Sequence, residues 1–270
     1  TPTVVIDHHR PSGSPAGTDP DVVVISGLDE DPAPTSALLA LRAVAGIADA
    51  DDLLWLAAMG IVGDMEDKAG FPEMDAARAR CGITAIRDAV SLVNAPRRTA
   101  AGDFGPALAL LMRAGNPKEL LSGEHPETAA LHAAKAEVAA AMAAAKRVAP
   151  VVRGDVAIIR LDSGCQIHPL VAQGWRGRLR DKLVIAANTG YRPGWVHFAM
   201  RSATGRDLVQ FLRDHRPPGA GTEEYGNGHA QATGGALRPA AWNRFTESLG
   251  FGAEMRVPAP EPNDAVEHAA

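Results

Sequence analysis

The sequence feature that most constrains the fold is a short run of β-branched, apolar residues near the start of the chain. Residues 3–6 form this run, and Asp7, His8 and His9 follow it directly, before a segment rich in turn-forming residues. Such a run, bounded by turn residues, predicts a buried strand. In open α/β sheets ligands bind beyond the carboxyl ends of the strands, which is where we expect these three side chains.

The acid and the two histidines allow two interpretations. A carboxylate and two imidazoles are donors that suit Mn²⁺, Zn²⁺ or Fe²⁺. Alternatively, the aspartate lies on the surface beside two solvated histidines. Three residues alone do not decide between a metal site and a solvated surface, so the choice depends on the motifs in the rest of the chain.

Composition excludes several classes of protein. Hydrophobic residues make up 46% and charged residues 22% of the 270 residues, which is typical of a globular chain. The formal net charge of -5 disfavours broad coating of nucleic acid, although clustered arginines can still form a local basic groove. No apolar run is long enough to span a membrane, and no signal peptide is visible. Cys81 and Cys165 form no metal-binding pair and fit a reduced, cytoplasmic interior.

The first half of the chain predicts a second strand over residues 21–26, followed mainly by helices. The expected helices span residues 37–48, with Thr35 or Ser36 as the cap, then 53–61, 75–94, 102–114 and 124–148. Asp64 follows the second of these helices, with glycines nearby that let backbone approach a ligand. It is either a metal ligand or an ordinary acid at a helix carboxyl end, where the helix dipole mildly disfavours it.

From Val151 onwards strands and helices alternate, which predicts a second, smaller α/β domain. We expect strands over 155–161, 183–187 and 195–200, and helices ending at Leu179 and spanning 205–214 and 239–249. The glycine-dense stretch 219–235 is expected to be a loop. Its backbone N–H groups either approach phosphate oxygens or belong to a flexible connector, and its spacing is neither a Walker loop nor a dinucleotide fingerprint.

Taken together, six segments in a fixed order resemble the motifs of the DHH phosphoesterase superfamily and, within it, the RecJ-like branch. The resemblance spans almost the whole chain. Asn227 stands where the family's loop usually has a glycine. The segments are Asp7-His8-His9, the apolar stretch from Ala57 to Asp64, Asn94-Ala95 with Arg98, His168-Pro169, Arg201-Ser202 and the glycine–histidine segment from Gly226 to His229.

The resemblance implies an α/β fold with three parts and a tail. The remainder of a parallel-sheet DHH domain, with a helical extension, is expected over residues 1–122. A long connecting helix would occupy 123–150, and a smaller α/β C-terminal domain that binds substrate would occupy 151–256. Residues 257–270 are expected to be disordered.

The resemblance also implies a site. Asp7, His8, His9 and Asp64 are the expected catalytic residues, with His8 and Asp64 as metal ligands, Asp7 as a supporting carboxylate and His9 on the scissile phosphate. Two Mn²⁺ or Mg²⁺ ions can generate a hydroxide and clamp both oxygens of an in-line displacement. Arginine and imidazolium groups balance the phosphoryl charge. The expected substrate-binding residues, besides His9, are Arg98, Arg201, Ser202, Gly226, Gly228 and His229.

The implied function is a metal-dependent phosphodiesterase, a RecJ-like exonuclease that acts on single-stranded DNA or RNA or on short oligonucleotides. Asn94, Ala95 and Arg98 favour this activity, with DNA-replication or repair proteins as partners and no membrane. The acidic net charge instead favours shorter substrates, such as nanoRNA, phosphonucleotides or cyclic dinucleotides. A non-catalytic nucleotide-binding protein is the alternative from another class, and the oligomeric state is open.

The family's first two motifs lie upstream of the Asp-His-His tripeptide and supply about half of its metal ligands. The sequence begins at Thr1, without a methionine, and enters a predicted core strand almost at once. We therefore expect it to be an incomplete copy of an active enzyme, inactive as it stands. If the natural chain does begin at Thr1, the binding-protein alternative takes the lead.

Overall fold

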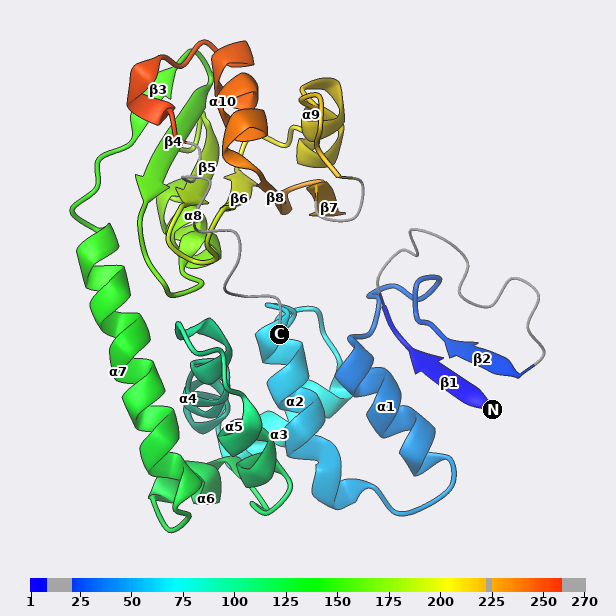
Figure 1. Cartoon of the computed structure of the whole chain (residues 1–270). Coiled ribbons are helices and arrows are strands. Elements are labelled where there is room, and N and C mark those ends of the chain that lie inside the picture. Colours follow the sequence, from blue (N-terminus) through cyan, green and yellow to red (C-terminus); the bar gives the residue numbers. More distant parts are fainter. Residues whose placement is uncertain (9–20, 222–224, 259–270) are drawn as a thin grey trace. The chain divides into compact units, whose positions relative to one another are not determined.

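A computed structural model describes residues 1–8, 21–221 and 225–258 of the chain (Figure 1). His9 and the predicted disordered tail beyond residue 258 lie outside these residues. The chain divides into two compact units. The first comprises Thr1–Pro96 and Asp103–Lys135, and the second comprises Arg97–Gly102 and Ala136–Ala270.

Two short parallel strands open the first unit. β1 (Thr3–Ile6) pairs with β2 (Val22–Ile25), in register from Thr3 opposite Val22 to Ile6 opposite Ile25. Both strands lie where the β-branched runs predicted them, because such side chains fit a pleated surface. Val4 and Val23, which are paired, remain 61% and 56% exposed, so the described residues leave this part of the strand pair uncovered.

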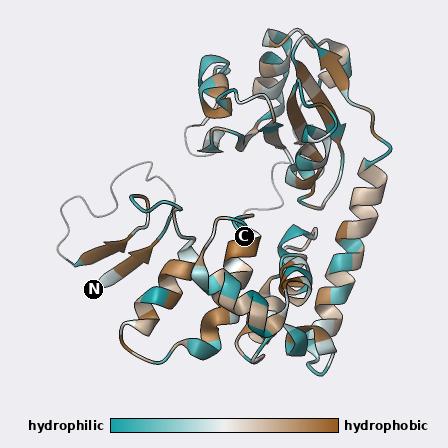
Figure 2. Cartoon of the chain, turned by 180° about the vertical axis from the view of Figure 1, so that it is seen from behind, coloured by the Kyte–Doolittle hydropathy of each residue, from teal (hydrophilic) through white to brown (hydrophobic). Residues whose placement is uncertain are grey.

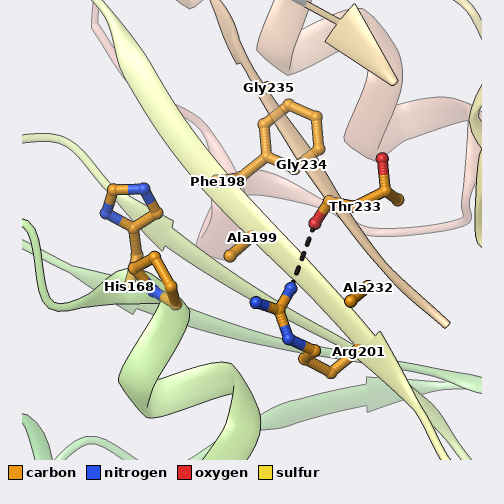
Figure 3. Close-up of a pocket in the computed structure, with 9 residues that line it drawn as sticks. His168, Phe198, Ala199, Arg201, Ala232, Thr233, Gly234 and Gly235 are labelled. Atoms are coloured by element: carbon orange, nitrogen blue, oxygen red, sulfur yellow. Dashed lines mark hydrogen bonds between the residues drawn. The ribbon is translucent and has the colours of Figure 1, made fainter. Parts of the chain in front are cut away.

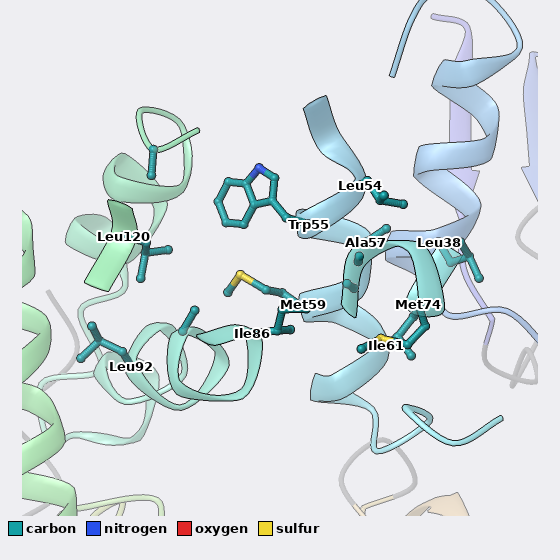
Figure 4. Close-up of a cluster of buried hydrophobic side chains, with 14 of the residues drawn as sticks. Leu38, Leu54, Trp55, Ala57, Met59, Ile61, Met74, Ile86, Leu92 and Leu120 are labelled. Atoms are coloured by element: carbon teal, nitrogen blue, oxygen red, sulfur yellow. The ribbon is translucent and has the colours of Figure 1, made fainter. Parts of the chain in front are cut away.

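Helices make up the rest of the first unit, and they pack around α2 (Leu54–Gly63). Nearly every side of α2 is apolar, and a helix of that kind lies in a core rather than on a surface. Figure 4 shows its side chains amid residues of α1, α3, α4 and α6. The other elements are α1 (Ser36–Ala45), η1 (Asp51–Leu53), α3 (Pro72–Cys81), α4 (Ile83–Val93), α5 (Gly105–Leu111) and α6 (Pro117–Ser122). The residues of η2 (Pro96–Arg98) and α7 (Glu127–Ala145) are divided between the two units.

Two glycines shape this helical core. A Cβ atom at Gly60 would lie 2.3 Å from Cβ of Ala37, so this glycine lets α1 and α2 approach closely. Gly82 has a φ of 83° and separates α3 from α4. The single helix predicted over residues 75–94 is therefore wrong.

No described helix combines the length and apolar character that crossing a bilayer requires.

The second unit is built on a six-stranded mixed sheet with the order β3-β4-β5-β6-β8-β7. β4 and β5 pair in parallel and are joined by α8 (His168–Arg176), and the other neighbouring pairs are antiparallel. The strands are β3 (Val151–Arg153), β4 (Val156–Leu161), β5 (Leu183–Asn188), β6 (Val196–Ser202), β7 (Tyr225–His229) and β8 (Ala232–Leu237).

Both faces of this sheet are covered, and successive residues of each strand alternate between them. Ile158, Ile185 and Phe198 face α9 (Leu208–Asp214), α10 (Pro239–Ser248) and the short η3 (Ala253–Met255). On the other side, Ile159 and Val184 face α8 and the second part of α7. Figure 2 shows the strands as largely apolar, as burial on two sides requires. The predicted α/β fold is confirmed.

The glycine-dense stretch is not the loop that its composition suggested. Its second half forms the β7–β8 hairpin at one edge of the sheet. A Cβ atom at Gly234 would lie 2.3 Å from the carbonyl oxygen of Phe198, and one at Gly228 would lie 2.5 Å from that of Ala232. Close approach of neighbouring strands therefore accounts for these glycines.

Replacing Gly60 with alanine should destabilise the first unit, because the added methyl group meets Ala37 of α1. We expect a loss of about 1–3 kcal/mol in the free energy of unfolding, measured by urea denaturation. Gly63→Ala in the same helix is the matched control. Its Cβ would meet nothing within 4 Å, and alanine favours helix, so this variant should be as stable as the parent or more so.

Candidate functional site

Asp7 and His8 lie directly beyond the carboxyl end of β1, as predicted. The backbone N–H of Asp7 donates to the carbonyl of Ile25 at 3.2 Å, which extends the β1–β2 pairing up to the site. The side chain of His8 is only 17% exposed, so its ring is held among protein atoms. His9, the third residue of the tripeptide, lies outside the described residues.

Ser36 connects these two side chains, and it was not predicted as a site residue. Its backbone N–H, one of the groups that a helix leaves without an intrahelical partner, donates to Nδ1 of His8 at 3.2 Å. Its hydroxyl oxygen lies 2.9 Å from the same Nδ1 and donates to Oδ1 of Asp7 at 3.5 Å. The hydroxyl can stay there because the neighbouring Thr35 caps α1, accepting from the N–H of Leu38.

Asp64 follows the last residue of α2, and its carboxylate faces His8. Oδ2 of Asp64 lies 3.7 Å from Nε2 of His8. The apolar character of α2 fixes this helix in the core and thereby delivers the acid to the end of β1. The structure thus brings together Asp7, His8 and Asp64, which are far apart in the sequence.

The chemistry of His8 and Asp64 fits a divalent cation, because an imidazole nitrogen and a carboxylate oxygen are donors that Mn²⁺ accepts. A histidine that binds metal through Nε2 carries its proton on Nδ1. In this structure Nδ1 accepts from the N–H of Ser36, so binding of a metal through Nε2 would require the proton to move to Nδ1, where the hydroxyl oxygen of Ser36, 2.9 Å away, could accept it. Within the described residues, however, no group of three or more His, Cys, Asp or Glu side chains could hold an ion. The described part of the site therefore supplies two ligands.

A second cluster lies in the second unit, where two arginines are partly buried. Burial lowers the pKa of Arg98 to about 10, and the charge of Arg97 adds to this effect. Burial, together with the charge of Arg176, also lowers the pKa of Arg201. The Arg201 guanidinium donates only to carbonyl oxygens, at 2.9 Å to Met200 and at 3.4 Å to Thr233. Among the described residues, neither arginine is paired with a carboxylate.

His168 completes this cluster. It is 5% exposed, and burial, followed by the charges of His197, Arg98 and Arg201, lowers its pKa to about 3. The carbonyl of Arg98 accepts from the N–H of Gln166 at 2.9 Å, which holds Arg98 beside the start of α8. Three basic side chains from distant segments therefore share one buried region. His197, with its ring centroid 6.1 Å from that of His168, was not predicted as a site residue either.

A pocket of about 360 Å³ opens between α8, β6 and β8 at this cluster (Figure 3). His168 and Arg201 line it, together with backbone of Thr233, Gly234 and Gly235. Nδ1 of His168 and Nε of Arg201 are buried and lack a hydrogen-bond partner among the described residues. Unsatisfied polar atoms of this kind are rare in proteins and commonly mark a ligand site.

The other predicted substrate-binding residues lie elsewhere in the second unit. Ser202 follows Arg201 on β6 and therefore faces the opposite side of the sheet. It is fully buried, and its hydroxyl contacts the side chain and N–H of Thr204 at 2.9 and 3.1 Å. Gly226, Gly228 and His229 lie on the edge strand β7, where Gly226 adopts a φ of 79° at a register shift. None of these four residues lines the pocket.

The low pKa of His168 predicts a specific pH dependence of stability. The unfolded side chain takes up a proton near pH 6.5 and the folded one only near pH 3, so the free energy of unfolding falls as the pH drops below 6.5. We expect this residue to remove about 2 kcal/mol between pH 7 and pH 5. Urea titrations at both pH values should show that His168→Gln loses less free energy of unfolding between pH 7 and pH 5 than the parent protein does. His132→Gln, at an exposed position of α7, should keep the full loss.

Comparison with known proteins identifies the architecture. No protein-family profile and no curated protein matches the sequence. Among solved structures, exonuclease RecJ bound to manganese matches with a TM-score of 0.53 and 18% identity, over 91% of this chain and 67% of that one. The DHH domain of a protein assigned to a family of ribosomal proteins matches with a TM-score of 0.61 and 17% identity, over 94% and 64%.

RecJ from Thermus thermophilus, in complex with Mg²⁺, matches with a TM-score of 0.54 and 22% identity. That match covers 94% of this chain and 43% of the Thermus protein, so this chain spans less than half of its length. At these identities the likeness establishes the fold, and it agrees with the order of motifs along the sequence. The chain has the fold that these RecJ and DHH-domain structures share.

Proposed function

We propose that this chain is part of a divalent-metal-dependent phosphodiesterase that acts in the cytoplasm on single-stranded DNA or RNA or on short oligonucleotides. The observation that carries the proposal is the pair of partly buried arginines, Arg98 and Arg201, which have no carboxylate partner among the described residues. The likeness in fold to an exonuclease bound to manganese supports the reaction class.

The partly buried arginines favour an anionic ligand for an energetic reason. Removing a cation from water costs several kcal/mol unless an opposite charge or hydrogen bonds compensate. Guanidinium groups hold phosphate oxygens through paired N–H bonds, and the pocket beside Arg201 also presents the backbone of two glycines. A phosphate of the substrate would therefore satisfy Arg201, Arg98 and the imidazole of His168 together.

The first unit would carry the metal. His8 and Asp64 would bind it, and Asp7 would support His8 through Ser36. A divalent ion at this position would supply positive charge to a phosphoryl oxygen and to the attacking water. Once Nε2 binds the ion, the hydroxyl oxygen of Ser36 would accept the Nδ1 proton of His8, in place of the N–H bond that Nδ1 accepts in this structure. His9 would contact the scissile phosphate.

The remaining predictions stay part of the proposal. Residues 1–122 would form the phosphoesterase domain, 123–150 the connecting helix and 151–256 the substrate-binding domain. Gly226, Gly228 and His229 would contact the nucleic acid from the edge of the sheet. Ser202 would act indirectly, because its hydroxyl holds the turn that follows Arg201.

Hydrolysis of labelled single-stranded DNA, RNA and short oligonucleotides by the full-length protein that contains this chain tests this proposal. We expect cleavage that needs Mn²⁺ or Mg²⁺ and that a chelator abolishes. Arg201→Met should raise KM by roughly tenfold or more, because a desolvated charge–phosphate contact is worth about 1.4 kcal/mol or more. Arg178→Met removes the same charge from a position over Trp175, outside the pocket, and should leave KM unchanged. Turnover that is indifferent to chelators would refute the metal mechanism.

Ser36→Ala provides a test of the metal site by binding alone. The substitution removes the oxygen that would accept the Nδ1 proton once Nε2 binds the ion, so we expect Mn²⁺ affinity to fall by roughly tenfold or more in calorimetric titration. Ser122→Ala is the control, since its hydroxyl only donates to the carbonyl of Glu119 at the end of α6. Equal Mn²⁺ affinity in both variants would show that Ser36 does not orient His8.

One observation favours a second candidate, a non-catalytic nucleotide-binding protein. The pocket at His168 and Arg201 is formed within the second unit, whereas the described residues hold no complete metal site. Such a protein would bind nucleotides equally well with Mn²⁺ and with a chelator, and His8→Ala would leave binding unchanged. Fluorescence anisotropy with a labelled oligonucleotide under both conditions separates the two functions.

A further inference from the structure

Helix α2 ends in an unusual way. The N–H of Met65 donates to the carbonyl of Val62 at 3.1 Å, and the N–H of Glu66 donates to the carbonyl of Ile61 at 3.0 Å. This pair of bonds is the Schellman motif, which closes a helix with one residue in the left-handed conformation. Here that residue is Met65, with a φ of 65°.

A methionine is an unfavourable choice for this backbone. The left-handed conformation brings Cβ close to the carbonyl oxygen that follows, a conflict that only glycine avoids. Among the described residues, every other residue with a positive φ is a glycine. Gly123 ends α6 with a φ of 84°. The left-handed residue after α6 is therefore glycine, which this backbone conformation favours. The left-handed residue after α2 is a methionine.

Packing does not compensate for this strain. The side chain of Met65 is 69% exposed and is absent from the hydrophobic cluster that surrounds α2. A strained residue with no folding gain points to a functional role. Met65 is joined by one peptide bond to Asp64, whose carboxylate faces His8 at 3.7 Å.

The chemistry of methionine indicates what it would contact. Its side chain is unbranched and ends in a polarisable thioether that packs favourably on aromatic rings. It carries no N–H or O–H group that could read the edge of a base. An exposed thioether beside a phosphodiester centre thus suits the face of a nucleobase and tolerates any base identity, as other stacking contacts do.

We propose that Met65 is a substrate-positioning residue that packs on the nucleobase next to the cleaved phosphodiester. This inference rests on the proposed function and deepens it. The substrate must carry a base at that position, and the enzyme does not discriminate among the bases there. The strain in the backbone at Met65 is retained for this contact.

The test compares Met65→Gly with the parent, both as the full-length protein that contains this chain, on two substrates. One is an oligonucleotide, and the other is the same oligonucleotide with an abasic residue at the cleaved position. We expect the unfolding midpoint of Met65→Gly to rise by about 2–4 °C. Its kcat/KM on the intact oligonucleotide should fall by roughly tenfold, mainly through KM. The parent and variant should cleave the abasic substrate with equal efficiency.

Two further measurements make the test specific. Met65→Leu should restore most of the lost efficiency, since it replaces the apolar surface without the sulfur. The affinity for a dinucleotide with a non-hydrolysable methylene phosphonate linkage should fall in parallel for Met65→Gly. Met112→Gly is the matched control. It removes another methionine, which is 80% exposed at the end of α5. This variant should not change the kinetics on either substrate and should not raise the unfolding midpoint.

The outcomes distinguish this inference from the function on which it rests. If the parent shows metal-dependent cleavage but Met65→Gly treats both substrates as the parent does, Met65 does not contact a base and only this inference is overturned. A parent without any metal-dependent cleavage overturns the proposed function, and the role of Met65 with it.

Discussion

Positive charge that no described carboxylate neutralises is the constraint on which the second unit depends. The groups concerned are Arg98 of η2, His168 of α8 and Arg201 of β6. Burial lowers the pKa of all three. Apolar packing on both faces of the sheet has to provide the free energy that keeps these groups out of water. The fully buried strand β5, next to β6, is the clearest sign of that packing.

The first unit places its polar groups differently, at the ends of regular elements. Asp7 and His8 leave the carboxyl end of a strand, Ser36 offers the unpaired N–H of a helix start, and Asp64 lies at a helix carboxyl end, where its charge is unfavourable. Met65 adds backbone strain at the same place. The charge of Asp64 and the backbone conformation of Met65 are thus both locally unfavourable for stability, and such a concentration is typical of functional sites.

Much of this architecture follows from local sequence. Apolar runs predicted β1, β2, β4, β5 and β6, and burial on both faces of the sheet explains the runs in β4 and β5. The β7–β8 hairpin was missed because its glycines, which serve close strand packing, have the composition of a loop. Convergence of His168 with Arg98 and Arg201 is a tertiary effect that spacing does not reveal. Whether Thr35 or Ser36 capped α1 was equally open; the Thr35 side chain accepts the capping bond from Leu38, whereas Ser36 contacts His8.

The position of the pocket within its sheet has a kinetic consequence. One side is formed by β6 and α8, next to the buried β5, whereas the other is β8, backed only by the edge strand β7 in the described sheet. Amide hydrogens of β5 should exchange with solvent last and those of the hairpin first, since edges open locally at lower free energy. The residence time of a bound anion would then depend on fraying of the hairpin, rather than on the strength of its contact with Arg201.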